Sequence, residues 1–439
     1  MIPIRISALA TAVLATVLAG AVLAPPASAA VVLGPLETIS VAVDDKNQAG
    51  WWSPIDEFAG RTYLAYNTDV LDNPGRHNVW VTRRDAAGSY ARGCLPNTTG
   101  TVCAEFTDDL GHNQPSLAVD GDGFIHVFAA MHNSTGITYY RSVRPGDPTE
   151  FARRTSELPD GSLGFTYPNV TRAPNGDLWL IIRARSVPTR AGARLYHWTN
   201  ATNSWSLVGG TAFAYQQSPQ RTVYPDDVQV TADGVVHIAF EWAYAATGVR
   251  HEGSYLQYRP GTNTFHVANG TQVAIPTTPA TPGLIFQPLM AGEAYDGDFG
   301  VQSAKLALRP SGTTWTPVIA YRYREVGTPT FKVRRARFVN GAWTRDIMYG
   351  GPSQTTAALD VTTAGSSDRV YYVKSDAGGT AIAAEQNGAS WVETPVAAGK
   401  PVQRLGVITR ANGTDLAYLC APTAISARRG ELYYREIGR

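Results

Sequence analysis

Residues 117–128 read Leu-Ala-Val-Asp-Gly-Asp-Gly-Phe-Ile-His-Val-Phe, so that an apolar segment, a turn around Gly123 and a second apolar segment follow one another. Glycine adopts the backbone conformations of tight turns, and short apolar segments on either side are typical of two paired β-strands. The same pattern recurs along the chain with turn glycines at Gly60, Gly123, Gly176, Gly234, Gly312, Gly365 and Gly413. The mean spacing of about 59 residues suits a repeat of four short strands with inserted loops.

The strand after each turn glycine is rich in Val, Ile, Tyr and Trp. These strands are expected at 61–66, 124–128, 177–182, 235–240, 315–321, 370–373 and 415–419. No helical periodicity of apolar residues runs through the chain after residue 30, which leaves a sandwich or a propeller as the all-β choices, and the repeat favours the propeller. We therefore predict one seven-bladed β-propeller domain over residues 31–439. The strand at 37–43 is expected to complete the last blade and close the ring.

Composition and charge exclude several classes of protein. The chain has 439 residues, of which 44% are hydrophobic, and 37 basic side chains against 36 acidic ones give a net charge of +1. A core of useful size is available, but there is no overall field that would hold nucleic acid or an anionic membrane. We expect neither of these partners, and we expect a monomer.

The first thirty residues predict export. Arg5 precedes an apolar run from Ala8 to Ala24, and small residues follow up to Ala30, as in a cleaved secretory signal peptide. We therefore expect a secreted, extracellular protein. In such a compartment Cys94 and Cys103 can close a short loop as a disulfide, whereas Cys420, in an apolar stretch, is expected to be a buried strand residue.

One geometric rule predicts a candidate site. In a propeller blade the start of the first strand and the end of the second emerge at the same rim. Residues about ten positions before and eight after a turn glycine should meet there, which selects His112 and His132 in the second repeat and Tyr167 and Arg183 in the third. We predict that these four side chains lie at one mouth of the ring.

Further residues are expected around that mouth. As substrate-binding groups we predict two polar side chains and four aromatic ones for stacking on sugar rings: Asn113, Arg322, Tyr224, Trp242, Tyr244 and Tyr295. His126, Trp179 and His237 occupy one equivalent position, three residues after successive turn glycines. We interpret that position as structural, because it lies close to the opposite end of the strands.

The four residues suit a specific reaction. An Arg beside a His binds and neutralises a carboxylate, which makes the neighbouring carbon acid easier to deprotonate. A Tyr and a second His then move protons, as β-elimination on a uronic acid requires. The reaction requires no metal or cofactor. A structural calcium or zinc ion is compatible with the sequence but is not predicted, and we assign no metal ligands.

The stretch 111–127, together with Met131-His132-Asn133, 165–169 and 178–183, resembles the BNR-4 group of secreted seven-bladed propellers, which includes ulvan lyases and lyases acting on rhamnose linked to glucuronic acid. The resemblance implies an active site of His112, His132, Tyr167 and Arg183. It implies that Tyr167 and His112 transfer protons and that Arg183 and His132 bind the carboxylate. The division of acid and base between Tyr167 and His112 stays open.

Three functions are consistent with this pattern. The first is a lyase acting on an anionic polysaccharide, either ulvan-like or a plant-gum glucuronate linkage, which yields a 4,5-unsaturated uronate. The second is a rhamnosidase-type hydrolase on the same propeller, and the third is a non-catalytic glycan-binding propeller. The lyase is favoured. The exact polymer and the choice of endo or exo action do not follow from the residues.

Overall fold

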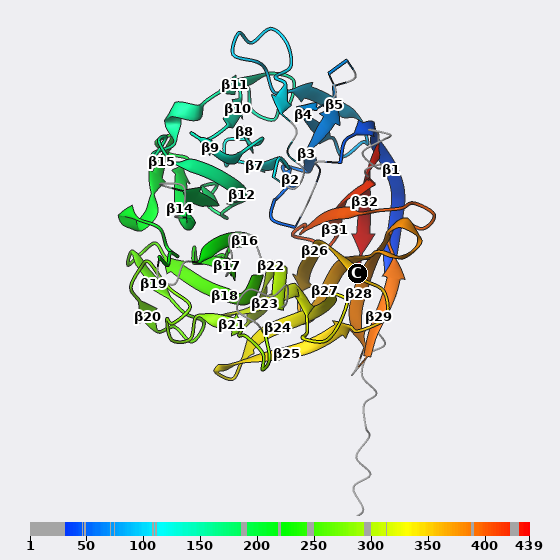
Figure 1. Cartoon of the computed structure of the whole chain (residues 1–439). Coiled ribbons are helices and arrows are strands. Elements are labelled where there is room, and N and C mark those ends of the chain that lie inside the picture. The colour runs from blue at the N-terminus through cyan, green and yellow to red at the C-terminus, as the bar shows by residue number, and fades with distance from the viewer. Residues whose placement is uncertain are drawn as a thin grey trace, which may run out of the picture.

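The computed structural model describes residues 31–439 apart from 46, 48–49, 71, 74, 108, 110–111, 186–190, 218–220, 244–249, 294–299, 313, 388–389 and 422–429. The predicted signal peptide, residues 1–30, lies outside the described residues. The described chain is all-β, and its helical segments are three short 3-10 turns: η1 (Thr155–Glu157), η2 (Val208–Gly210) and η3 (Asp376–Gly378). The sheets follow one another around a ring, as in a β-propeller (Figure 1). None of the helices among these residues is long or apolar enough to cross a membrane.

Each repeat forms a set of antiparallel strands in chain order. The first repeat holds β2 (Ile55–Phe58), β3 (Arg61–Asp69), β4 (Arg76–Arg84), β5 (Tyr90–Cys94) and β6 (Phe106–Thr107). The second holds β7 (Ser116–Val119), β8 (Ile125–Phe128), β10 (Tyr139–Ser142) and β11 (Phe151–Arg153). The third holds β12 (Gly164–Arg172), β13 (Leu178–Arg185), β14 (Ala191–Thr199) and β15 (Ser204–Leu207), and β9 (His132–Thr135) joins it at the edge of β12.

The remaining repeats follow the same plan. The fourth holds β16 (Thr222–Val230), β17 (Val236–Ala243), β18 (Arg250–Arg259), β19 (Thr264–His266), β20 (Gln272–Val273) and β21 (Ile285–Gln287). The fifth holds β22 (Gly300–Ser311), β23 (Thr314–Arg324), β24 (Lys332–Val339) and β25 (Ala342–Tyr349). The sixth holds β26 (Thr355–Ala364), β27 (Ser367–Lys374), β28 (Thr380–Asn387) and β29 (Ser390–Pro395). The seventh holds β30 (Arg404–Thr409), β31 (Asp415–Ala421), β32 (Gly430–Gly438) and, from the other end of the chain, β1 (Val32–Val43).

The predicted turn glycines separate paired strands in every repeat. All seven have a positive φ, between 57° and 91°, and each lies between two strands that pair antiparallel. At Gly176 a further constraint acts, because an added Cβ would lie 2.7 Å from the Cα of Gly121 in the neighbouring repeat. The backbone N–H of Gly121 donates to the Gly176 carbonyl at 2.9 Å. Only glycine allows these two turns to approach so closely.

The N-terminal strand closes the ring, as the sequence predicts. β1 pairs antiparallel with β32 from Val32 opposite Gly438 to Val43 opposite Gly430. Val43 also pairs with Thr68 of β3, so the first and seventh repeats share one nine-stranded sheet. The described strands therefore form six sheets. The count of seven blades stays a prediction, and the all-β class is confirmed.

Adjacent sheets pack face to face, which buries both faces of the inner strands. β17 is buried at every residue, and β13 at every residue except Arg185. Three inner-strand carboxylates join neighbouring sheets by accepting a backbone N–H from the next one: Asp56 from Val119 at 2.8 Å, Asp227 from Leu306 at 2.9 Å and Asp360 from Val407 at 2.6 Å. Chemically similar contacts thus recur around the ring and link strands of neighbouring sheets.

The cysteines lie as expected. Cys94 and Cys103 form a disulfide. Cys420 is free and fully buried in β31, and burial raises the pKa of its thiol. A buried, protonated thiol is a packing residue and not a nucleophile.

Candidate active site

Two histidines and one carboxylate form the centre of the site. The imidazole rings of His112 and His132 are stacked, with centroids 3.5 Å apart and planes 3° apart. Asp109 bridges them: its Oδ1 lies 2.8 Å from Nδ1 of His112, and its Oδ2 contacts Nδ1 of His132. His112 lies in the loop before β7, and His132 begins β9, so the two meet where the second and third repeats adjoin.

Tyr167 reaches the pair because β12 is interrupted. The register of β12 against β13 shifts between Thr166 and Asn169, and Tyr167 in this bulge has φ of 59°. The left-handed region is unfavourable for a residue with a side chain and costs on the order of 1–3 kcal/mol. The bulge turns the Tyr167 ring to a centroid distance of 5.7 Å from His112. Strain of this kind is typical of functional positions.

Arg183 lies behind Tyr167 on β13. Its Cζ is 4.5 Å from the centre of the Tyr167 ring and 4.9 Å from that of Tyr224. The side chain is 5% exposed. Its Nη2 donates to Oδ1 of Asn133 at 3.3 Å, and its Nε is buried without a hydrogen-bond partner among the described residues. No carboxylate in that part of the chain pairs with it, so the guanidinium retains donors for an external anion.

A cluster of aromatic side chains packs around Tyr167. Trp51, Trp52, Tyr167 and Tyr224 pack together with Ala243. The Tyr167 ring lies 5.2 Å from Trp52, 5.7 Å from Trp51 and 5.1 Å from Tyr224, measured between centroids. These contacts hold the Tyr167 ring from three sides, which favours a single orientation of its hydroxyl.

The charges of the centre follow from burial and hydrogen bonding. Burial lowers the pKa of His112, and the positive charges of His132 and Arg183 lower it further, against the hydrogen bond to Asp109. Burial raises the pKa of Asp109, but the hydrogen bonds from His112 and His132 outweigh this and leave it below its ordinary value. Near neutral pH, Asp109 is therefore ionised and His112 uncharged. An ionised carboxylate only accepts hydrogen bonds, so Nδ1 of His112 carries the proton and Nε2 has a free lone pair.

Asp109, His112 and His132 also bring three potential metal ligands together. Their ligand atoms lie within 4.8 Å of one another. A metal ion bound by an imidazole lies in the plane of the ring, and two parallel rings stacked 3.5 Å apart have no common plane. The arrangement fits a carboxylate that bridges two imidazoles better than it fits one shared ion.

Of the ten predicted catalytic and substrate-binding residues, the structure brings together the four expected at one mouth: His112, His132, Tyr167 and Arg183. Tyr224 also belongs here, although it is only 7% exposed and packs on Tyr167 rather than forming an open stacking surface. Tyr244 and Tyr295 lie outside the described residues.

Three other predicted substrate contacts are buried and have partners inside the protein. Trp242 is fully buried in the core between sheets, with Nε1 donating to Ser254 at 2.9 Å, because β17 stays buried to its last residue. It offers no face to a sugar. Asn113 is 3% exposed, and its amide donates to the Thr107 carbonyl at 2.7 Å, so it supports the loop of His112 from within. Arg322 bonds to Gln302 and lies over the Phe331 ring in the fifth repeat, at 8% exposure.

The residues interpreted as structural have structural partners. Buried His126 binds Asp120 through Nε2 at 3.0 Å and Tyr139 through Nδ1 at 2.8 Å. Trp179 stacks on His197 with centroids 4.1 Å apart. His237 contacts the Tyr255 hydroxyl through Nδ1.

Sequence reasoning missed Asp109, Asn133, Trp51 and Trp52. A signal for Asp109 was present, because a carboxylate three residues before a histidine can orient its ring. Asn133 follows His132 directly and has φ of 53°. The two tryptophans lie in the loop between β1 and β2, far along the chain from the other residues, and no periodicity points to them.

Comparison with known proteins gives the same picture of the fold. The sequence matches the BNR repeat-containing family over residues 61–348. The crystal structure of polysaccharide lyase Uly1 is similar at a TM-score of 0.67 and 14% identity, covering 92% of this chain and 99% of that one. The structure of a family PL25 ulvan lyase bound to -[GlcA(1-4)Rha3S]- is similar at a TM-score of 0.65 and 14% identity, covering 90% of this chain and 93% of that one. No curated protein matches.

Proposed function

The chain belongs to the BNR repeat-containing family, and from that premise we propose that it is a polysaccharide lyase acting on a polymer of rhamnose and uronic acid by β-elimination. The observation that carries the proposal is the cluster of His112, His132, Tyr167 and Arg183 around one mouth. The fold shared with Uly1 and with the ulvan lyase supports the same reaction class.

In this proposal the substrate carboxylate binds between Arg183 and His132. Arg183 has a buried Nε without a described partner and is preorganised by Asn133 and by the rings of Tyr167 and Tyr224. His132 adds a second group beside the carboxylate, and its charge lowers the pKa of the stacked His112. Neutralising the carboxylate acidifies the C5 proton of the uronate, because the negative charge of the carbanion spreads onto that group.

His112 and Tyr167 then divide the proton transfers. Nε2 of His112 takes the C5 proton, since Asp109 holds the other nitrogen protonated. The C5–H electron pair forms the C4–C5 double bond, the C4–O bond breaks, and the leaving oxygen takes the proton of the Tyr167 hydroxyl. Water is not consumed, and no cofactor is required. The product carries a 4,5-unsaturated uronate at its new non-reducing end.

The remaining parts of the proposal concern the whole protein. We count seven blades, taking the first and seventh repeats of the nine-stranded sheet as separate, because Val43 and Thr68 are the pair that joins them. The Cys94–Cys103 disulfide supports a secreted, extracellular protein. A monomer is part of the same proposal.

The test is to incubate the mature protein with uronate polysaccharides, including ulvan and gum arabic, and to follow the ultraviolet absorbance of the conjugated double bond. We expect a rise with a rhamnose-containing uronate polymer and none with Arg183→Ala. Release of free rhamnose without this absorbance would establish a hydrolase instead. Binding without either product would establish a glycan-binding propeller.

A further inference from the structure

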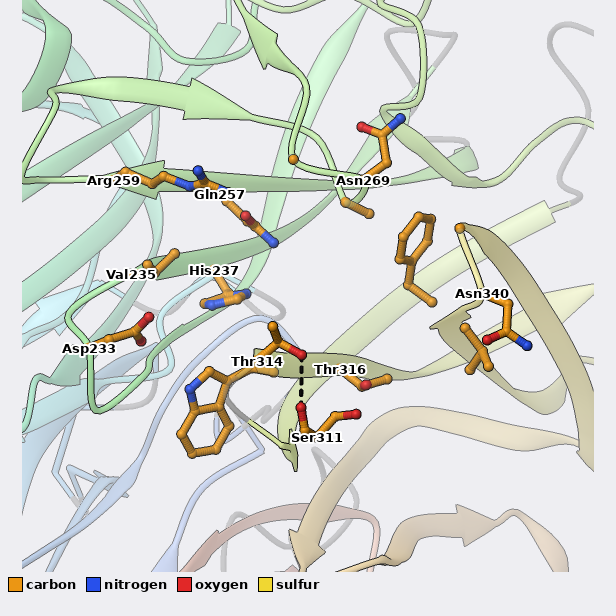
Figure 2. A pocket seen from close by; sticks show the side chains of 16 residues that line it. Asp233, Val235, His237, Gln257, Arg259, Asn269, Ser311, Thr314, Thr316 and Asn340 are labelled. Atoms are coloured by element: carbon orange, nitrogen blue, oxygen red, sulfur yellow. Dashed lines mark hydrogen bonds between the residues drawn. The ribbon is translucent and has the colours of Figure 1, made fainter.

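A second cleft opens far from the candidate active site. It lies between the fourth and fifth repeats, has a volume of about 720 Å³ and includes residues next to the turn glycines of both (Figure 2). The active-site residues Tyr167 and Arg183 lie at the other end of their strands. A strand of eight residues such as β17 spans roughly 25 Å, so the two sites lie on opposite faces of the ring.

One wall of the cleft is a buried polar network. The hydroxyl of Tyr255, which is fully buried, contacts Nδ1 of His237 and accepts from Nε2 of Gln257 at 3.0 Å. His237 is 3% exposed and Gln257 9%, and Figure 2 shows both side chains directed into the cleft. Nε2 of His237 and the amide oxygen of Gln257 have no other partner among the described residues. Polar atoms held in this way present fixed hydrogen-bonding positions to a ligand.

The wall carries no net charge. Burial lowers the pKa of His237 to about 3, so the imidazole is neutral. Asp233 and Arg259 both line the cleft on this side and offset one another (Figure 2). A ligand that depends on a single strong charge is therefore not favoured here.

The rest of the lining suits a sugar ring. Trp315 and Phe338, both partly exposed, supply aromatic surface, and the amides of Asn269 and Asn340 supply donors and acceptors. Aromatic faces pack against the C–H faces of a pyranose while amides and imidazoles bond to its hydroxyl groups. We propose that this cleft is a second, non-catalytic site that binds a neutral sugar unit of a polysaccharide. The proposal does not depend on the lyase reaction.

The experiment uses the full mature chain with the Arg183→Ala substitution, which removes the proposed carboxylate site. The probes are methyl glycosides of rhamnose, galactose, arabinose, xylose and glucose, and binding is followed by saturation-transfer NMR. We expect at least one glycoside to bind, and binding to weaken at least about tenfold on adding Trp315→Ala or Gln257→Leu.

A control variant is Ile347→Ala, which changes an exposed side chain (60%) on β25 outside the cleft lining and should leave binding intact. Far-UV circular dichroism and the melting temperature establish that each variant is folded. The proposal is overturned if no glycoside binds, or if bound glycosides are unaffected by both folded cleft variants. Neither result bears on whether the wild-type protein makes unsaturated uronate.

Discussion

At the residue scale, Asp109 couples the two imidazoles of the site. Its bonds to both Nδ1 atoms fix the tautomer of His112 and raise the pKa of that ring against burial. We expect Asp109→Asn to reduce kcat on the order of 10²- to 10⁴-fold, because the amide no longer selects the protonated nitrogen.

The same variant has a pH signature. Removing the carboxylate lowers the pKa of His112 further, so the acid limb of the kcat/KM profile should move to lower pH. The pH dependence of kcat/KM for wild type and Asp109→Asn checks this. A loss of activity with an unmoved acid limb would mean that Asp109 only supports the loop.

Substitution of Tyr167 by Phe can separate the role of its hydroxyl group in proton transfer from the role of its ring in packing. Tyr167→Phe keeps the ring contacts with Trp52 and Tyr224 and should lower the free energy of unfolding by no more than about 1.5 kcal/mol, the net worth of one hydrogen bond. Activity should fall on the order of 10²- to 10⁴-fold, since the leaving oxygen loses its proton donor. Tyr224→Phe is the matched control, the same change in a neighbouring ring, and should retain most of the activity. Equal losses in the two variants would remove Tyr167 from the mechanism.

Counting residues before and after each turn glycine brought four residues to one mouth, because this count depends only on strand length and on the reversal of the chain at each turn. The count does not predict how far along a strand its side chains remain buried. Trp242 lies one residue further from its turn glycine than Arg183 does from its own, yet it is fully buried and Arg183 reaches the site. Burial at a strand end depends on the adjoining sheet and its loops, which no local pattern records.

At the element scale, β1 is held to the first repeat by an ion pair. Both guanidinium nitrogens Nε and Nη2 of Arg84 donate to the Glu37 carboxylate, at 2.8 and 2.6 Å, and Tyr90 donates to it as well. This contact joins β1 to β4 and β5 across the point where the ring closes. Bidentate pairs of this type are the stronger surface ion pairs.

We expect Glu37→Gln to lower the free energy of unfolding by about 1 kcal/mol at neutral pH. The hydrogen bond from Arg84 holds the pKa of Glu37 below its ordinary value of 4.5 despite desolvation. The contribution is therefore present above that value and is lost as pH falls through the lowered pKa. Urea unfolding at neutral and acidic pH measures both effects. The control is Glu393→Gln, which removes a carboxylate that bonds to Tyr372 and Lys374 within one sheet. If Glu37→Gln still destabilised the protein in acid, the stabilisation would not come from the ionised Glu37.

The strands themselves were largely predictable. Each turn glycine sits in a left-handed conformation between two paired strands, and this requirement is local, so it is visible in sequence. The pairing of β1 with the last repeat was predicted because a strand at 37–43 would complete the last blade and close the ring. The link from Val43 to Thr68, which merges two repeats into one sheet, depends on a single residue pair and leaves no pattern.

At the scale of the whole molecule, Asp360 makes stability depend on pH. It accepts N–H groups of Val361 and Val407 and so joins the sixth and seventh repeats. Burial raises its pKa from 3.8 to about 7, against the charge of Lys305. The folded state thus favours the protonated acid, and its contribution is present at low pH and lost as pH rises toward 7.

We expect the free energy of unfolding to fall across this window by up to about 1.4 kcal/mol per pH unit from this group. Near pH 4, Asp360→Asn should be less stable than wild type. The difference in the free energy of unfolding should shrink as the pH rises toward 7. Thermal unfolding over the window measures this, with the exposed Asp122→Asn as control. A difference that grows with pH would show that the ionised form is the one the fold prefers.

The pairing of β1 with β32 has a consequence for how the chain is made. The two strands come from opposite ends of the sequence, so the ring closes only after the last strand has been synthesised. Until then β1 and β31 each expose an unpaired edge, and such edges associate with other chains. A nascent chain that stops before Gly430 should therefore be found in aggregates rather than as a smaller soluble propeller.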